Sequence, residues 1–173
     1  MKTIVVLAMH GAPPGDFPRA ESGEYFGLLS RLKHSSGPDR AAMERRFAEL
    51  DAKMRAWPRT AQNDPYFAAA QSLSAALGPA TGSEIEVGFN EFCNPTLDEA
   101  LDRAMAADPD RVVVATPMMT RGGNHSEEDI PHAIDRARER HPVVPVVYAW
   151  PFEVADIASF LASQIDSCLE KGY

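Results

Sequence analysis

Two histidines and one carboxylate follow apolar runs that are typical of β-strands. His10 comes directly after the run 4–9, and His125 lies in the segment that follows the run 112–115. Glu91 comes one turn past a third such run. Because the carboxyl ends of parallel strands meet at one edge of a sheet, we expect the three side chains to converge there. Two imidazoles and a carboxylate with open coordination positions suit a divalent transition metal, and the carboxylate can also accept protons.

The segment after His125 offers a group that could orient its ring. The acidic residues 127–129 precede Pro131, which suits the first turn of a helix, and acidic side chains favour the positive end of the helix dipole. Helix capping accounts for most of these carboxylates. The alternative for one of them is a hydrogen bond to the second ring nitrogen of His125, as carboxylates behind metal ligands make.

The remaining histidines and the two cysteines carry a weaker signal. His34, His132 and His141 are interpreted as exposed or hydrogen-bonded side chains without a role in the site. Cys93 is interpreted as a small buried core residue and not as a soft metal ligand. Cys93 and Cys168 form no CxxC pair, so the expected location is the reducing cytoplasm.

Four apolar runs predict the strands that position these residues. The runs are 4–9, 84–89, 112–115 and 143–148, and helical patterns are found at 66–77, 97–105, 130–140 and 154–169. Strands that alternate with helices form a parallel sheet with helices on both faces. The first and third runs are continuously apolar, as central strands are, whereas the second alternates and the fourth contains Pro145, which suits an edge. We therefore predict an α/β, flavodoxin-like fold with four strands in the order 2-1-3-4.

A long helical insertion, residues 12–65, separates the first predicted strand from the next helix. An apolar stripe at spacings of four and three predicts one helix within it, formed by Met43, Phe47, Leu50, Met54 and Trp57. On the opposite side of this helix, Arg45, Glu49 and Lys53 are spaced to pair with one another.

An earlier helix is expected at residues 24–33, with Phe26, Leu29 and Leu32 or similar residues buried. Two helices in one insertion suggest a helical hairpin that serves as a lid or as a contact between subunits. The alternative is that the insertion simply completes the core.

Length and charge limit the classes of function. The chain of 173 residues, 45% of them hydrophobic, predicts a single domain, 1–173, with an ordinary core. Its formal charge of -8 argues against nucleic acid and anionic membranes as partners, because both require a basic surface. The first apolar run is too short to span a membrane and lacks a cleavage site, so it is interpreted as a strand and not as a signal peptide.

Large apolar side chains gather at the same predicted edge of the sheet. They end the third and fourth runs and are Met118, Met119, Tyr148, Trp150 and Phe152. Such a surface beside a metal site suits a large planar ligand, and core packing is the alternative interpretation.

Three stretches carry a recognisable pattern: the strand that ends at His10, the stretch 88–97 around Glu91, and the stretch 123–131 around His125. In these stretches the sequence resembles the class II tetrapyrrole chelatases of the CbiX and sirohydrochlorin chelatase type, which are relatives of ferrochelatase. The resemblance implies that His10 and His125 hold the incoming metal, beside an acidic position at Glu91. It further implies insertion of cobalt or ferrous iron into a sirohydrochlorin-like tetrapyrrole.

The resemblance also implies the remaining parts of the reaction. His10, His125 or Glu91 would accept the protons that the pyrrole nitrogens lose, and no organic cofactor is needed because the divalent metal is itself a substrate. Arg121 and Asn124 are expected to bind the substrate. Arg121 would pair with the carboxylates of the tetrapyrrole. Double-length members of the family carry two such halves, whereas this chain carries one, so a homodimer is implied.

The sequence departs from the short members of the family and leaves rival functions to be weighed. The opening continues as Gly11-Ala12 where the short members have Gly-Ser, and the insertion is long. The resemblance therefore does not decide between cobalt and iron.

A histidine phosphatase needs an arginine before His10, where this chain has Met9. A non-catalytic metal or tetrapyrrole carrier would keep the histidines but would not need Glu91 as a base.

Overall fold

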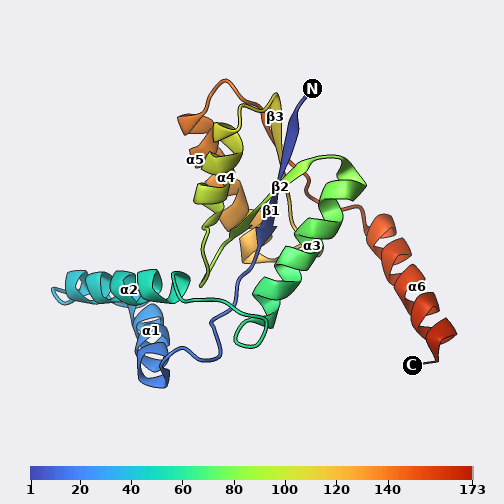
Figure 1. Cartoon of the computed structure of the whole chain (residues 1–173). Coiled ribbons are helices and arrows are strands. Elements are labelled where there is room, and N and C mark those ends of the chain that lie inside the picture. The colour runs from blue at the N-terminus through green and yellow to red at the C-terminus, as the bar shows by residue number, and fades with distance from the viewer. Residues whose placement is uncertain (173) are drawn as a thin grey trace.

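The computed structural model describes residues 1–172 and contains one four-stranded parallel sheet (Figure 1). The strands are β1 (Thr3–Met9), β2 (Glu84–Phe89), β3 (Arg111–Ala115) and β4 (Val146–Tyr148). Their order is β2-β1-β3-β4, which confirms the predicted flavodoxin-like arrangement. β4 starts at Val146 and not at residue 143. The preceding Pro145 has no N–H for the ladder, although its carbonyl accepts from the Val112 N–H.

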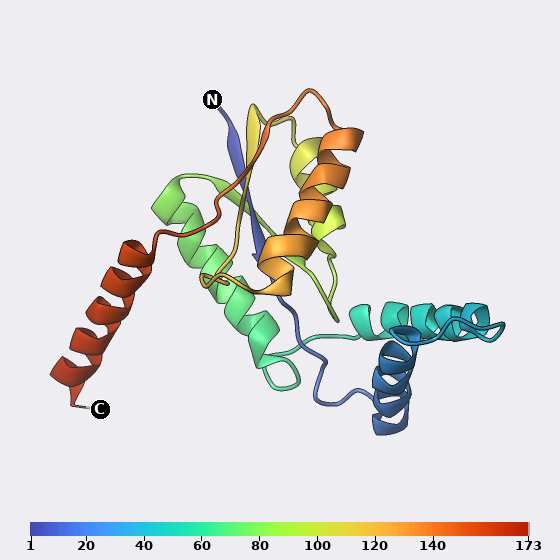
Figure 2. The same cartoon turned by 180° about the vertical axis from the view of Figure 1, so that it is seen from behind.

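Helices cover both faces of the sheet. They are α3 (Pro65–Thr81), α4 (Leu97–Ala106) and α5 (Ile130–Arg140). Figures 1 and 2 show α4 and α5 on one face and α3 on the other. The side chain of Asp64 caps α3 by accepting from the Phe67 N–H, and Thr96 with Glu99 forms a capping box at the start of α4. The helices predicted at 66–77, 97–105 and 130–140 are confirmed.

Two apolar clusters join the helices to the sheet. Val6, Val114 and Leu101 are among the fully buried side chains between the sheet and α4–α5. On the other face, Phe89 of β2 stacks on Phe67 of α3, with 5.7 Å between the ring centroids. These clusters fix the carboxyl ends of β1, β2 and β3 relative to one another.

The insertion forms the predicted helical hairpin at the carboxyl end of the sheet (Figure 1). Its helices are α1 (Arg19–Leu32) and α2 (Arg40–Arg55). The apolar stripe of α2 belongs to a third cluster, in which Leu50 and Met54 are buried together with Tyr25 and Leu28 of α1 and with Phe92. The hairpin therefore has a small core of its own beside the sheet.

The predicted limits and buried face of the first hairpin helix are wrong. α1 begins at Arg19, earlier than residue 24, and the residues it buries are Tyr25 and Leu28. Phe26 is 41% exposed and Leu32 is half-buried, whereas the third predicted residue, Leu29, does pack against the hairpin core. The buried positions of α1 begin one residue earlier than predicted, because α2 packs on the side of α1 that carries Tyr25.

The predicted ion pairs along α2 are also wrong. Lys53 pairs with Glu21 of α1 at 2.7 Å, and Glu49 pairs with Arg46 at 3.1 Å. Arg45 takes no part in these pairs. Because α1 lies beside α2, its carboxylates compete for the lysine and arginine side chains of α2.

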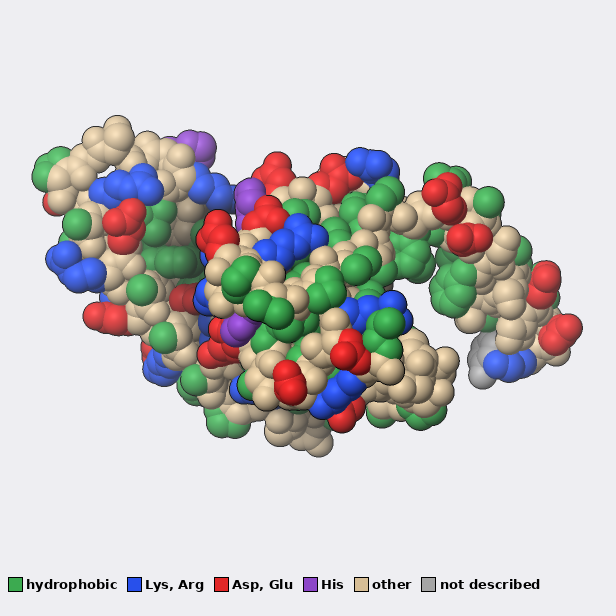
Figure 3. Space-filling model, turned by 90° about the horizontal axis from the view of Figure 1, so that it is seen from above, with side chains coloured by type: hydrophobic (Ala, Val, Ile, Leu, Met, Phe, Trp, Pro, Cys, Tyr) green, Lys and Arg blue, Asp and Glu red, His purple; other side chains and the backbone are tan. Residues whose placement is uncertain are grey.

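The last helix, α6 (Val154–Lys171), confirms the helix predicted at 154–169. Seen from above in Figure 3, it forms a projection at the side of the molecule opposite the α1–α2 hairpin. Within residues 1–172, no helix is long and apolar enough to cross a membrane.

Candidate metal centre

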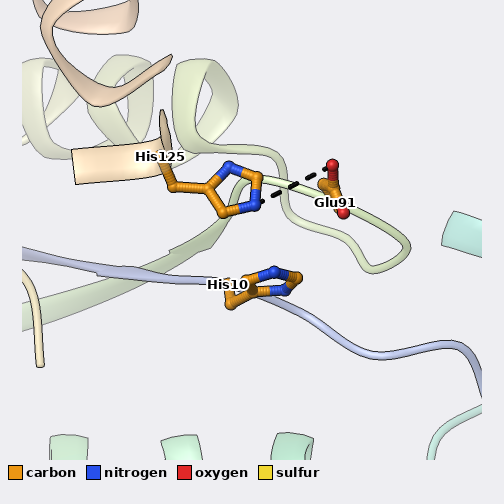
Figure 4. A group of neighbouring side chains, drawn as sticks. All are labelled: His10, Glu91 and His125. Atoms are coloured by element: carbon orange, nitrogen blue, oxygen red, sulfur yellow. Dashed lines mark ion pairs between the residues drawn. The ribbon is translucent and has the colours of Figure 1, made fainter. Parts of the chain in front are cut away.

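The side chains of His10, Glu91 and His125 meet at the carboxyl edge of the sheet (Figure 4). One possible ligand atom from each lies within 4.8 Å of the other two. The Nε2 atom of His125 is 3.9 Å from the Oε1 atom of Glu91, and the two imidazole rings lie edge to face with centroids 4.3 Å apart. All three residues are half-buried, so a small ion can reach them from solvent.

Glu91 is placed by an extension of the β1–β2 pairing beyond the ends of the strands. The Asn90 N–H donates to the Met9 carbonyl and the Glu91 N–H to the His10 carbonyl, both at 2.9 Å. Gly11 permits this approach, since its φ is +103° and a Cβ atom there would lie 1.9 Å from the Glu91 carbonyl oxygen. The glycine after His10 is therefore a structural requirement of the site.

His125 opens a single π-helical turn, η1 (His125–Asp129), that leads directly into α5. Its Nδ1 atom hydrogen bonds to the Asp129 carboxylate at 2.6 Å, so one of the three predicted acidic residues does orient the ring. The turn is braced on two sides. The Ser126 hydroxyl donates to the Gly123 carbonyl, and the Tyr148 hydroxyl donates to the Ser126 carbonyl at 3.0 Å.

The hydrogen bonds of both imidazoles leave Nε2 free. The Nδ1 atom of His10 lies 2.7 Å from the Gly11 carbonyl, which can only accept, so Nδ1 carries the proton. The same reasoning applies to His125, because an ionised Asp129 carboxylate also only accepts. Two imidazole nitrogens and the Glu91 carboxylate are thus a donor set that fits a divalent transition metal.

The loop that carries Glu91 is held by an arginine at the end of α2. Arg55 donates to the Asn90 carbonyl at 3.1 Å and to the Cys93 carbonyl at 3.2 Å. Its Nε atom donates to the Asp51 carboxylate at 2.8 Å. These bonds fix the main chain on both sides of Glu91.

A second arginine, Arg59, holds the same loop from a buried position. It donates to the Asp64 carboxylate and to three main-chain carbonyls, those of Ala12, Met54 and Phe92. The side chains of Arg59 and Asp64 are only 5% and 1% exposed. Arg59 therefore joins the segment after His10, the end of the hairpin and the Glu91 loop at one point.

A model of the CbiX family matches residues 60–167, which is more than half of the chain. The chain belongs to the CbiX family. The matched segment holds Glu91 and His125, whereas His10, Arg55 and Arg59 precede it.

Two similar proteins come from Priestia megaterium. A sirohydrochlorin ferrochelatase is 30% identical over 82 residues, which are 47% of this CbiX chain and 30% of the relative. A sirohydrochlorin cobaltochelatase is 38% identical over 74 residues, or 43% of this chain and 24% of the relative. The aligned segments thus cover less than a third of each of these relatives.

A solved structure agrees with the fold over almost the whole chain. The CbiX protein from Marinobacter aquaeolei VT8 matches with a TM-score of 0.56 and 14% identity, covering 98% of this chain and 99% of that one. At this identity the match supports the shared fold, including the position of the N-terminal strand outside the segment 60–167.

Two cavities border the metal centre of this CbiX chain on different sides. One, of about 540 Å³, is lined by the two histidines and by mostly apolar residues that include Met118, Met119 and Leu161. The other, of about 430 Å³, lies between the hairpin and the starts of α4 and α5, and its lining includes Glu91 and Arg55. The imidazoles therefore face an apolar cavity, while Glu91 faces a polar one.

The structure separates the two residues that were expected to bind substrate. Asn124 lines the apolar cavity beside His125. Arg121 lines neither of these two cavities; its side chain is 70% exposed and lies 3.1 Å from the Glu127 carboxylate. The Gly122 N–H and the Arg121 guanidinium hold the pKa of Glu127 below its usual value.

The residues interpreted as structural behave as such in the CbiX fold. Cys93 is 1% exposed, and burial raises the pKa of its thiol. His141 hydrogen bonds to Asp102 at 3.0 Å, and His34 is exposed on the hairpin. His132 lines the polar cavity but is not part of the converging group.

The predicted aromatic cluster is present but lies outside both cavities described above. Tyr148 and Trp150 stack with centroids 6.2 Å apart, and Phe152 meets Trp150 edge to face at 5.7 Å. Of the predicted apolar rim, only Met118 and Met119 line the cavity beside the histidines.

Sequence reasoning missed Arg55 and Arg59 as parts of the site. Both come from the insertion, and each contacts the Glu91 loop from more than 30 positions away along the chain. The nearest signal was Asp64-Pro65, a typical helix start, which does not reveal that Asp64 also pairs with a buried arginine.

Proposed function

We propose that this CbiX chain inserts a divalent metal ion, cobalt or ferrous iron, into a sirohydrochlorin-like tetrapyrrole. The observation that carries the proposal is the convergence of His10, Glu91 and His125 beside an apolar cavity. The names of the relatives, sirohydrochlorin ferrochelatase and cobaltochelatase, support the same class of reaction.

The metal, as a substrate, would be held by the two Nε2 atoms and by the Glu91 carboxylate. Three protein ligands leave open positions on a divalent ion, and the ring nitrogens can enter there. The hydrogen bond from His125 to Asp129 keeps that imidazole in one tautomer and orientation while the ligands exchange.

The macrocycle would lie in the apolar cavity, against Met118 and Met119. Asn124, which lines this cavity, would contact the rim of the ring. Arg121 would bind one of the substrate's carboxylates by exchanging its exposed partner Glu127, at little cost because exposed ion pairs are weak. No organic cofactor is required by this chemistry.

Insertion must remove two protons from the pyrrole nitrogens as the two positive charges of the metal enter. Glu91 is the proposed acceptor of both protons in turn. Once released from the metal by the ring nitrogens, its carboxylate takes one proton, passes it to water and then takes the second. Its side chain is 39% exposed and faces the polar cavity, which gives the proton a path to water.

The proposal extends to assembly and location. A homodimer would join two sheets of the kind that double-length chelatases carry in one chain. A cytoplasmic location fits a chain in which both cysteines, Cys93 and Cys168, are free thiols.

The test is anaerobic visible spectroscopy of sirohydrochlorin with Co²⁺ or Fe²⁺. The wild type should accelerate the change to the metallated spectrum, and His10→Ala and His125→Ala should remove the acceleration. His34→Ala is the matched control, since it deletes an exposed imidazole on the hairpin and should leave the rate unchanged.

Glu91→Gln separates a chelatase from a carrier. In a chelatase with Glu91 as the base, the variant still binds the macrocycle but inserts metal at least about 100-fold more slowly, the usual size of a general-base contribution. A wild type that binds the ring without accelerating insertion would contradict the proposal, as would full activity of Glu91→Gln.

A further inference from the structure

Phe92, the residue after Glu91, has a backbone conformation that bulky side chains rarely adopt. Its φ is +60°, in the left-handed region that favours glycine. The Cys93 N–H donates to the Glu91 carbonyl at 2.7 Å, which closes a three-residue turn around Phe92. Within residues 1–172, the other positive-φ residue that is not glycine is the exposed Asp108, and aspartate tolerates this region. A bulky residue stays there only when its surroundings fix it.

The insertion fixes both the main chain and the ring of Phe92. Its carbonyl accepts a hydrogen bond from Arg59, whose side chain is 5% exposed. Its ring is 7% exposed and belongs to the apolar cluster of the hairpin. The rings of Tyr25 and Phe26, both on α1, lie 5.9 Å and 6.0 Å from the Phe92 ring between centroids. The hairpin therefore holds Phe92 in its unfavourable conformation.

The same ring also contacts an imidazole of the metal centre. The ring centroids of Phe92 and His10 are 6.5 Å apart, and the two planes differ by 28°. This distance lies within the usual range for aromatic pairs. The bond between the His10 Nδ1 atom and the Gly11 carbonyl holds one atom of the imidazole, and the stacked ring limits its tilt. Phe92 therefore connects His10 to α1.

Phe92 thus reaches two of the three residues of the metal centre by different routes. It adjoins Glu91 in the main chain, within the turn that the Cys93 N–H closes. It meets His10 through its ring. The third residue, His125, is oriented by Asp129 in its own turn.

We propose that Phe92 is a positioning residue through which the α1–α2 hairpin sets the affinity of the site for the metal. Its positive φ keeps the ring against His10 while the preceding carboxylate points into the site. The inference rests on the proposed metal centre. It holds whether or not the bound metal is then inserted into a tetrapyrrole.

Simple core filling does not account for the conformation of Phe92. Leu50 and Met54 fill the same cluster from α2, with 1% and 0% exposure and ordinary helical backbone. A residue that only packed against the hairpin would not need a left-handed backbone. The turn is explained once the ring must also stack on His10.

The first experiment titrates the full chain with Co²⁺ and follows the visible absorption. Phe92→Leu keeps most of the apolar volume but removes the ring that stacks on His10. The Kd for Co²⁺ should rise about 10-fold, as for other residues that orient metal ligands. The visible bands of the loaded protein should change as well, because they report the geometry of the ligands.

Phe17→Leu is the matched control for Phe92→Leu. Phe17 is 5% exposed in the same cluster, and its ring packs on Trp57 with 5.1 Å between centroids. The control should lose stability but keep the wild-type Kd and the wild-type bands. A merely structural role of Phe92 predicts the same result for both variants.

A second experiment tests whether the hairpin acts through Phe92. Phe26 is 41% exposed, so Phe26→Leu changes a contact of the Phe92 ring at little cost to folding. This variant keeps the inference testable if Phe92→Leu does not fold. Its Kd for Co²⁺ should rise, by no more than about 10-fold. In a Phe92→Leu background the same change should have no further effect, because coupled residues are not additive. Additive effects would overturn the route through Phe92.

A third experiment separates the backbone conformation from the ring. Phe92→Gly and Phe92→Ala both remove the ring, but glycine adopts a positive φ without strain. Phe92→Gly should therefore unfold at a higher urea concentration than Phe92→Ala, the reverse of the order found at ordinary φ values. It should bind Co²⁺ no more tightly than Phe92→Ala, since its main chain no longer fixes Glu91. A lower urea midpoint for Phe92→Gly would contradict the strained turn.

The outcomes keep the two proposals apart. A wild-type Kd and wild-type bands in Phe92→Leu would overturn the inference and leave the metal centre intact. A wild type that binds no Co²⁺ would contradict the metal centre and the inference with it. A raised Kd in Phe92→Leu supports the inference even if the wild type does not accelerate metal insertion, which would contradict only the proposed reaction.

Discussion

His125 and Glu91 point at the same place but are held there by different means. His125 is held by its neighbours in the chain: Asp129, four residues on, binds its ring, and Ser126 closes the turn onto Gly123. The Glu91 loop is held by distant side chains, since Arg55 reaches the Asn90 carbonyl across 35 positions and Arg59 reaches the Phe92 carbonyl across 33.

The insertion therefore helps to position the Glu91 loop of the proposed metal centre. The His125 turn lies wholly inside the segment 60–167 that matches the CbiX family, and so does the Glu91 loop. The two arginines that hold the Glu91 loop lie before that segment, at the end of the hairpin and just after it. A change in the hairpin should therefore disturb Glu91, the proposed carboxylate ligand, before it disturbs the imidazole of His125.

The largest expected effect comes from breaking the long-range support. Arg59→Met removes one partner of a buried ion pair and leaves the Asp64 carboxylate uncompensated at 1% exposure. The free energy of unfolding should fall by about 3–5 kcal/mol, as for other broken buried pairs. Urea denaturation followed by circular dichroism measures it.

Arg46→Met is the control for this loss. Arg46 also bonds to two carboxylates, those of Glu24 and Glu49, but its side chain is 43% exposed. Its removal should cost much less stability than the removal of Arg59, because exposed ion pairs are weak. Equal losses of unfolding free energy in the two variants would contradict the prediction that the buried arginine contributes more to stability than the exposed one.

The next prediction concerns Asp129, which holds His125 from within the same turn. Asp129→Asn keeps the shape of the side chain but removes the charge that orients His125. The dissociation constant for Co²⁺ should rise about 10- to 100-fold, with little change in unfolding free energy. A titration followed by visible absorption measures the constant.

Asp135→Asn serves as the matched control for Asp129→Asn, because Asp135 lies on α5, which follows the π-helical turn, and pairs with the exposed Arg138. Unchanged Co²⁺ affinity in Asp129→Asn would mean that the π-turn alone holds His125 in place.

The same comparison explains which parts of the site were predictable. Strand ends and the order 2-1-3-4 follow from apolar runs and from Pro145, and they suffice to bring His10, Glu91 and His125 to one edge. The partner of the His125 ring could be limited to the three acidic residues 127–129, because Asp129 lies within one helical turn of His125.

The long-range contacts were not predictable because they depend on how the hairpin packs. The phase of α1 is set by α2, so Phe26 is exposed and Tyr25 is buried against the prediction. Arg55 and Arg59 have ordinary spacings along the chain, and only the packed hairpin brings their guanidinium groups to the Glu91 loop.

A smaller effect should follow when the support from Arg55 is weakened without removing its charge. Arg55→Lys can still pair with Asp51 but cannot reach the Asn90 and Cys93 carbonyls at once, because it lacks the planar fork. We expect a loss of about 1 kcal/mol in unfolding free energy, the value of one hydrogen bond. Since the Glu91 loop is loosened, Co²⁺ affinity should fall with it. A stability loss with unchanged Co²⁺ affinity would separate Arg55 from the positioning of Glu91.

The smallest effect concerns the outer brace of the His125 turn, the Tyr148 hydroxyl on the Ser126 carbonyl. Tyr148→Phe should lower the unfolding free energy by about 1 kcal/mol at pH 7. Burial raises the pKa of Tyr148 from 10.0 to about 12, so the folded state holds this proton more tightly than the unfolded state does. The stability that Tyr148 contributes is therefore complete below pH 10 and is lost as the pH rises from 10 to 12. Urea denaturation of both proteins across that range should show the wild type losing its advantage over Tyr148→Phe. A constant difference up to pH 12 would contradict the raised pKa of the buried Tyr148 hydroxyl.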